Sequence, residues 1–186
     1  MACRQLFSAQ LSPKPYLGVD KQVLVSQVPD PAQCQQAVAD AIDVGYRSID
    51  TAVAYMNESA VGAAIAESGV AREELFITTK LWVQDAGYES ARKAIRTSLE
   101  NLGLDYLDLY LIHQPMGDYI GAYRAMEEAY EEGILKAIGV CNFYPARLTD
   151  FCETVKIMPA VDQVVIGQKE SVLTVPDDFK LILEDE

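Results

Sequence analysis

Residues 75–113, LFITTKLWVQDAGYESARKAIRTSLENLGLDYLDLYLIH, hold two apolar segments on either side of one amphipathic segment. The apolar segments, 75–80 and 106–113, have the length and composition of buried strands. Between them, residues 88–102 carry apolar side chains at three- and four-residue spacing and stop before Gly103, which is typical of a helix that covers a sheet. The stretch therefore predicts a strand–helix–strand unit with parallel strands.

The same alternation extends along the chain in both directions. Further helices are predicted from Pro31 to Gly45, at 58–68, at 120–132 and from Pro145, and further strands at 46–50, 135–141 and 160–165. Helices that alternate with short, nearly all-apolar strands are typical of a parallel sheet covered by helices.

Polar residues close four successive strands of this pattern. They are Asp50, Lys80, His113 and Asn142, at intervals of 30, 33 and 29 residues, and each interval is about one βα unit. An open doubly wound sheet is the alternative, but the chain has neither G-x-G-x-x-G nor G-x-x-x-x-G-K for phosphate binding. We therefore predict a TIM-type (β/α) barrel. It should be incomplete, with about six of eight strands, because a whole barrel takes about 250 residues.

Composition limits the class of protein. Half of the 186 residues are hydrophobic and 23% are charged, which indicates a globular chain. The net charge of −13 disfavours nucleic acids and anionic membranes as partners. No membrane span or signal peptide is expected. The four cysteines lack C-x-x-C spacing, so we predict reduced thiols in a cytoplasmic protein.

Four residues of different chemical type carry the functional hypothesis: Asp50, Tyr55, Lys80 and His113. Taken singly, each has an ordinary structural interpretation. Asp50 would cap the following helix, Tyr55 would be a packing aromatic and Lys80 would extend to water. His113 would be a structural histidine. The barrel, however, places all four on the same rim, where reactive groups from separate strands meet.

Their chemistry fits the reduction of a carbonyl group. Hydride transfer builds negative charge on the carbonyl oxygen, which needs a proton donor and oriented hydrogen bonds. A phenol with a pKa of about 10 is a weak acid at neutral pH, but the Lys80 ammonium would lower the pKa of Tyr55. The Asp50 carboxylate would keep that ammonium charged. His113 would orient the carbonyl oxygen.

At these residues the sequence resembles the aldo-keto reductase family, over roughly 28–164. The matching motifs are Gly45-Tyr46-Arg47-Ser48-Ile49-Asp50-Thr51-Ala52, Tyr55-Met56-Asn57-Glu58, Thr79-Lys80-Leu81-Trp82, Leu111-Ile112-His113 and Ile138-Gly139-Val140-Cys141-Asn142-Phe143. The resemblance implies a (β/α)8 barrel that uses NADPH to reduce aldehydes or ketones to alcohols. It also implies that Tyr55 donates the proton within a tetrad with Asp50, Lys80 and His113.

The resemblance assigns further residues to the cofactor and the substrate. Asn142 and Gln163, with Asp50, fall where the family holds the nicotinamide end, and Trp82 falls where a loop lines the substrate pocket beside His113. Structural interpretations stay open, since Asn142 could cap the helix from Pro145 and Trp82 could be a packing aromatic. No metal-ligand spacing is present.

Both ends depart from the family pattern, so we divide the chain into an atypical segment 1–28, a barrel core 29–164 and an acidic tail 165–186. Leu17-Gly18-Val19 looks like the start of the first strand. Val165-Ile166 and Lys169-Glu170-Ser171 faintly resemble the family's late phosphate-binding strand, but the match is too poor to assign a role to Lys169. Asp162 and Cys141 stand where the family more often has Asn and Ser. An unclosed barrel must cover its edges, for example in a homodimer. Losing two or three phosphate contacts would weaken NADPH binding by about 10²- to 10⁶-fold.

Two other functional hypotheses remain at this point. The chain could be a catalytically impaired family member that acts at most as an interaction or scaffold protein, which the aberrant ends favour. It could also be an unrelated barrel aldolase in which Lys80 forms a Schiff base. The sequence does not name the carbonyl substrate.

Overall fold

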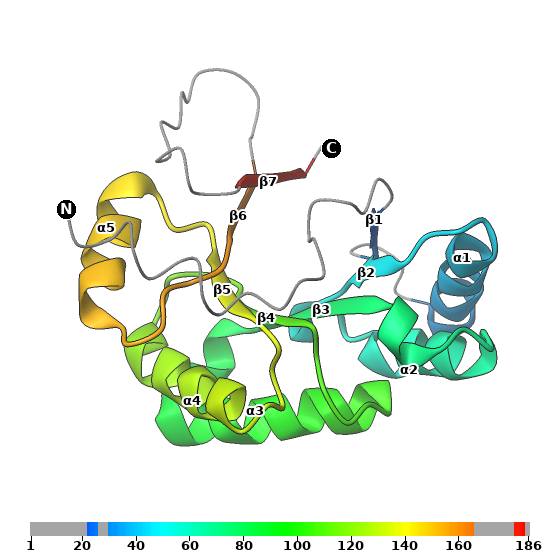
Figure 1. Cartoon of the computed structure of the whole chain (residues 1–186), viewed down its shortest axis with the longest axis horizontal. Helices are drawn as coiled ribbons and strands as arrows, with labels where there is room; N and C mark the ends of the chain where they lie inside the picture. Colours follow the sequence, from blue (N-terminus) through cyan, green and yellow to red (C-terminus); the bar gives the residue numbers. More distant parts are fainter. Residues whose placement is uncertain (1–21, 26–29, 166–180, 185–186) are drawn as a thin grey trace.

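A computed structural model describes residues 22–25, 30–165 and 181–184 of the chain. Within these ranges seven strands form one parallel sheet, and they follow one another in the sheet in the order β1 to β7. Their bounds are β1 Gln22–Leu24, β2 Ser48–Asp50, β3 Phe76–Leu81, β4 Leu109–Ile112, β5 Ile138–Cys141, β6 Asp162–Val165 and β7 Leu181–Glu184. The sheet curls, with its helices outside the curve (Figure 1). This arrangement is an incomplete TIM-type barrel, as the sequence predicts.

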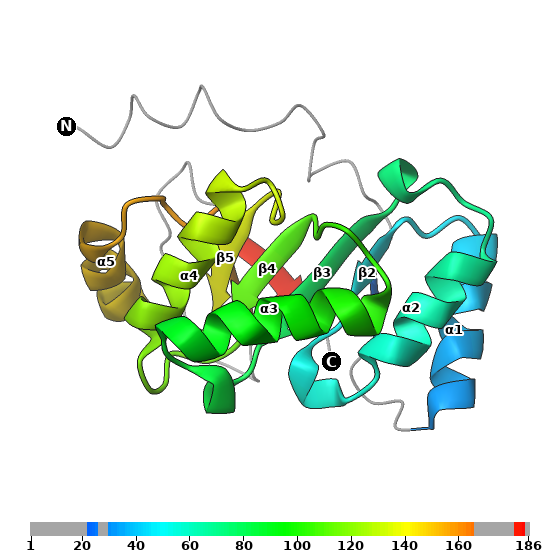
Figure 2. The same ribbon diagram turned by 90° about the horizontal axis from the view of Figure 1, so that it is seen from below.

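In the described part of the chain, five α-helices cover the outer face of the sheet (Figure 2). They are α1 Pro31–Asp43, α2 Glu58–Glu67, α3 Tyr88–Leu102, α4 Tyr119–Glu131 and α5 Pro145–Thr154. Asp30 caps α1, because its Oδ1 accepts the amide hydrogen of Gln33 at 2.8 Å. None of the helices in the described ranges combines the length and the apolar character that a membrane crossing requires.

Side chains of successive strand residues divide between two apolar clusters. Tyr110, Ile112 and Val140 belong to the large cluster between the sheet and the helices, whereas Leu109, Leu111, Cys141 and Val161 form a second, smaller cluster. Since neighbouring residues of a strand point to opposite faces, the second cluster lies on the inner face of the curve. This alternation decides which polar side chains enter the barrel.

The sheet differs from the prediction at both ends. It has one strand more than the six predicted, because residues 181–184 of the acidic tail pair with β6 from Asp162↔Leu181 to Val165↔Glu184. The sequence did not predict this strand, because it has four residues and no helix follows it to continue the alternation of strands and helices. At the other end, β1 pairs with β2 through Gln22↔Ser48, while Leu17–Val19 and Lys169 lie outside the described residues. Among the described strands, β1 and β7 are the two edges of the sheet.

Candidate active site

Asp50 and Lys80 form an ion pair inside the barrel. Asp50 ends β2 and Lys80 lies near the end of the adjacent β3, so the two side chains enter from neighbouring strands. The Lys80 Nζ lies 2.6 Å from the Asp50 Oδ1, and each side chain is 1% exposed. Burial opposes the charge on Lys80. The attraction of Asp50, followed by that of Cys141 and Tyr55, nevertheless raises the pKa of Lys80 above its ordinary value.

Gln163 reaches Asp50 from the other side of the curve. It lies in β6, four strands away from β2, and its Nε2 donates to the Asp50 Oδ2 at 2.8 Å. The Gln163 Oε1 accepts from the Cys141 thiol at 3.4 Å. Both carboxylate oxygens of Asp50 are therefore engaged, and the side chains of β2, β3, β5 and β6 converge inside the barrel.

Tyr55 lies beside this ion pair, on a short 3-10 turn, Val53–Tyr55, that follows β2. The Lys80 Nζ is 5.5 Å from the centroid of the Tyr55 ring. The same ring meets the imidazole of His113 edge-on, with centroids 5.7 Å apart and an interplanar angle of 87°. The phenol, the ammonium, the carboxylate and the imidazole of the predicted tetrad thus lie in one cluster.

His113 directly follows β4 and lies between two aromatic rings. Trp82, which follows β3, meets it edge-on at 5.1 Å between centroids. Burial, and then repulsion by the Lys80 ammonium, lowers the pKa of His113 from 6.5 to about 4. At neutral pH the imidazole is therefore uncharged, with one N–H donor and one acceptor nitrogen. Its Nδ1 is buried and has no hydrogen-bond partner among the described residues.

Asn142 holds the loop that carries His113. It follows β5 in the left-handed conformation, with φ 60°, and its Nδ2 donates to the backbone oxygen of His113 at 3.2 Å. The helix from Pro145 has Tyr144 as its N-cap, with no side-chain cap. Asp50 and Asn142 therefore do not cap the helices that follow them. Lys80 is buried in an ion pair and does not extend to water.

Asn57 and Glu58 form contacts that were not predicted from the sequence. Asn57 accepts from the Thr51 hydroxyl at 2.6 Å and donates to the backbone oxygen of Val25 at 2.7 Å. Glu58 accepts from the Thr79 hydroxyl at 2.8 Å. The available signal was the presence of two consecutive polar residues shortly after Tyr55, at the start of a mostly apolar helix.

Asp162, where the family more often has Asn, is a buried carboxyl group at the start of β6. Its exposed fraction is 2%, and its Oδ1 accepts the amide hydrogen of Phe143 at 3.3 Å. Burial raises the pKa of Asp162 from 3.8 to about 7, although the hydrogen bond from Phe143 opposes the shift. Between about pH 4 and 7 the folded state keeps a proton that the unfolded state has already released. The free energy of unfolding therefore falls as pH rises through this window.

Replacing Asp162 by Asn should remove this fall in stability with rising pH. The amide oxygen keeps an acceptor for Phe143 and carries no charge, so the free energy of unfolding above pH 7 should rise by about 1–3 kcal/mol. Urea denaturation at pH 5 and pH 8 measures the effect, with the exposed Asp150→Asn as control. An Asp162→Asn variant with the same pH dependence as the wild type would contradict this account of the carboxyl group.

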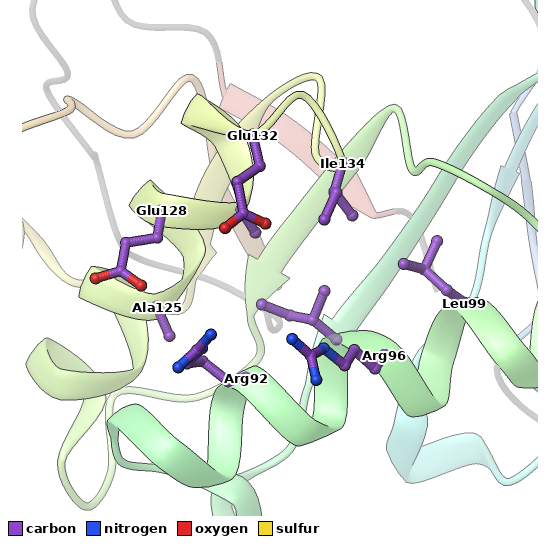
Figure 3. Close-up of a pocket in the computed structure, with 9 residues that line it drawn as sticks. Arg92, Arg96, Leu99, Ala125, Glu128, Glu132 and Ile134 are labelled. Atoms are coloured by element: carbon purple, nitrogen blue, oxygen red, sulfur yellow. The ribbon is translucent and has the colours of Figure 1, made fainter.

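Two hollows in the surface of the described residues lie away from this cluster. One, of about 30 Å³, lies between α3 and α4, where Arg92 and Arg96 lie opposite Glu128 and Glu132 (Figure 3). The Tyr88 hydroxyl donates to the Glu128 Oε2 at 2.6 Å across the same interface. A larger hollow of about 320 Å³ lies between α2 and α3. Neither is lined by a predicted site residue, and complementary charges explain the first as a helix–helix contact.

Residues 22–167 match the model of the aldo/keto reductase family. The chain belongs to the aldo/keto reductase family. A curated relative, the glyoxal reductase of Bacillus subtilis, is 51% identical over 141 residues, which are 75% of this chain and 51% of the relative. The 9,11-endoperoxide prostaglandin H2 reductase of Trypanosoma cruzi is 48% identical over 151 residues, 81% of this chain and 52% of the relative.

Solved structures of aldo/keto reductases share the fold. The enzyme from Brucella melitensis superposes with a TM-score of 0.76 at 44% identity, over 78% of this chain and 57% of that one. A Bombyx mori aldo-keto reductase in complex with NADP gives a TM-score of 0.74 at 36% identity, over 78% of this chain and 53% of that one. The chain thus spans about half the length of the curated relatives it matches.

Proposed function

We propose that this aldo/keto reductase chain reduces small aldehydes or ketones to alcohols, with NADPH as hydride donor and Tyr55 as proton donor. The observation that supports it is the convergence of Tyr55 and His113 on the buried Lys80–Asp50 pair, with Lys80 2.6 Å from Asp50. These groups come from three strand ends and one connecting turn. Their close association inside one barrel is the arrangement that carbonyl reduction needs.

The inner strand ends fit the nicotinamide end of the cofactor. Asn142 and Gln163 are carboxamides beside the tetrad. The Asn142 amide donates to the backbone oxygen of His113, the Gln163 amide donates to Asp50, and the Cys141 thiol donates to Gln163. Together they would hold a carboxamide-bearing ring against the cluster. Bound NADPH would supply the hydride for the carbonyl carbon. We expect weak binding, since the net charge of −13 opposes an anionic cofactor.

The remaining chemistry belongs to the chain's own residues. His113, neutral at neutral pH, would donate a hydrogen bond to the carbonyl oxygen and orient it, with Trp82 beside it as an apolar wall. Tyr55 would transfer its hydroxyl proton to that oxygen as negative charge develops there. The Lys80 ammonium would stabilise the phenolate that remains, and Asp50 would keep Lys80 charged and in place.

The direct test is NADPH consumption by the purified chain with reactive aldehydes. Glyoxal, the substrate type in the name of the Bacillus subtilis relative, and a nitrobenzaldehyde are suitable probes. We expect aldehyde-dependent loss of NADPH absorbance and formation of the alcohol. If the chain consumes no NADPH above the rate without protein, the reductase proposal fails and the scaffold interpretation replaces it.

Cytoplasmic location and dimerisation through the sheet edges remain predictions. A dimer would pair or cover β1 and β7, the two edge strands of the described sheet. Light scattering at several concentrations tests that association independently of activity.

A further inference from the structure

Glu58 connects three elements through one buried carboxyl group. It is the first residue of α2 and is 4% exposed. Its Oε1 accepts from the Thr79 hydroxyl of β3 at 2.8 Å, and its Oε2 accepts from the Asn101 amide of α3 at 3.1 Å. The amino-terminal end of α2 also favours a negative charge at this position. The carboxyl group is therefore held from two sides.

The hydroxyl that Glu58 accepts belongs to the residue before Lys80. Because side chains alternate along a strand, Thr79 points outward to the helices while Lys80 points into the barrel. Thr79 is fully buried, and Lys80 is 1% exposed. Asp50 thus holds Lys80 from the inside, and Glu58 holds the same piece of β3 from the helical side.

The close packing of α2 against α3 brings Asn101 within hydrogen-bond distance of Glu58. Gly62 lies one turn after Glu58, and a Cβ at this position would lie 2.4 Å from the backbone oxygen of Leu102. Only glycine permits so close an approach of the two helices. Leu102 adjoins Asn101, so the approach brings the Asn101 amide to Glu58.

Asn57 fixes the segment that carries Tyr55 next to the same anchor. The Thr51–Asn57 hydrogen bond joins the two ends of residues 51–57, and Asn57 also donates to Val25 beyond β1. Thr51 directly follows Asp50. Consecutive residues, Asn57 and Glu58, therefore tie the Tyr55 segment to the Asp50 strand and to the Lys80 strand.

We propose that Glu58 is a positioning residue, which through Thr79 fixes Lys80 relative to Tyr55 and His113 without touching the substrate. Its kinetic consequence rests on the proposed reductase function, whereas its geometric consequence does not. Displacement of a catalytic group by about 1 Å costs up to about 100-fold in rate. Glu58 should therefore affect kcat much more than KM.

The pKa of His113 reports the position of Lys80 without any need for enzymatic activity. It can be followed on its own because His113 is the single histidine of the chain. Burial and Lys80 lower its pKa to about 4, and a pH titration followed by the imidazole NMR signal would measure it. If Lys80 moves away, the pKa of His113 should rise toward its ordinary value of about 6.5. Loss of the Glu58 negative charge by itself would shift this pKa downward, so a rise reports movement of Lys80.

The test compares Glu58→Ala and Thr79→Val with the conservative variants Glu58→Gln and Thr79→Ser. The first two remove the bond, and we expect an upward shift of the His113 pKa and a kcat about 10- to 100-fold lower, with KM within about twofold. The conservative pair keeps an acceptor or a hydroxyl and should restore most of both values. If Glu58→Ala fails to fold, Thr79→Val alone tests the proposal, because valine is favoured in strands.

A matched control is Glu127→Ala, which removes another buried carboxyl group from a helix. Glu127 accepts the amide hydrogens of Lys156 and Ile157, both at 2.7 Å, between α4 and the turn after α5. It should lower stability and leave the pKa of His113 unchanged. A folded Thr79→Val variant with wild-type values of the His113 pKa would overturn the proposal. Absence of activity in the wild type would count against the reductase function alone.

Discussion

Replacing Tyr55 by Phe is expected to lower kcat for aldehyde reduction by about 10²- to 10⁴-fold, the usual contribution of a positioned proton donor. The variant keeps the ring that meets His113 at 5.7 Å and lies over the Lys80 ammonium at 5.5 Å. Packing and stability should therefore change little. Steady-state rates of NADPH consumption and urea denaturation measure the two quantities separately.

Tyr106→Phe is the matched control for this change. Tyr106 packs against the guanidinium of Arg72 at 4.0 Å, outside the tetrad, so loss of its hydroxyl should leave kcat unchanged. If Tyr55→Phe and the wild type consume NADPH at equal rates, the hydroxyl of Tyr55 is not the proton donor. The role of the tetrad would then have to be reassigned.

Replacing Lys80 by Met is expected to lower the free energy of unfolding by about 3–5 kcal/mol, because it leaves the Asp50 carboxylate charged, buried and without its cation. The hydrogen bond from Gln163 to Asp50, at 2.8 Å, would remain. Reductase activity should also be lost, since nothing then stabilises the Tyr55 phenolate. Urea denaturation gives the stability and NADPH consumption gives the activity.

The double variant Asp50→Asn/Lys80→Met separates these two effects. Removing both charges avoids an unpaired buried ion, so much of the lost stability should return. Activity should not return, because the ammonium is still missing. A Lys80→Met variant as stable as the wild type would contradict the buried ion pair, and an active double variant would contradict the role of Lys80.

Much of the fold was predictable because its elements carry periodic signals. The helix predicted at 88–102 coincides with α3, Tyr88–Leu102. β3 has the predicted length, shifted by one residue, but the other predicted strands are shorter in the structure, since apolar residues extend beyond the hydrogen-bonded part. The strand predicted at 106–113 becomes β4, Leu109–Ile112, with a single bridge from Leu107 to Leu135 before it. The strand at Leu181–Glu184 was missed because its pairing depends on tertiary contact rather than on a local pattern.

The candidate site divides in the same way. Asp50, Lys80 and His113 were predictable as neighbours because parallel strands end at one rim. The inward reach of Gln163 across the barrel depends on curvature, which no local pattern encodes, although the family resemblance placed the residue. Glu58 was unassigned because a carboxyl group at a helix start is ordinary on a surface. Only the packing of α2 against β3 and α3 shows that it is buried beside Thr79.

The most direct test of the account is the titration of the single imidazole of the chain, His113, by NMR in the wild type and in Lys80→Met. In the structure the ammonium of Lys80 lies in one buried cluster with His113 and Tyr55. We expect a pKa of about 4 in the wild type and a clear rise in the variant, because repulsion by the ammonium is removed. A wild-type pKa near 6.5, unchanged in Lys80→Met, would place His113 apart from Lys80 and contradict the account.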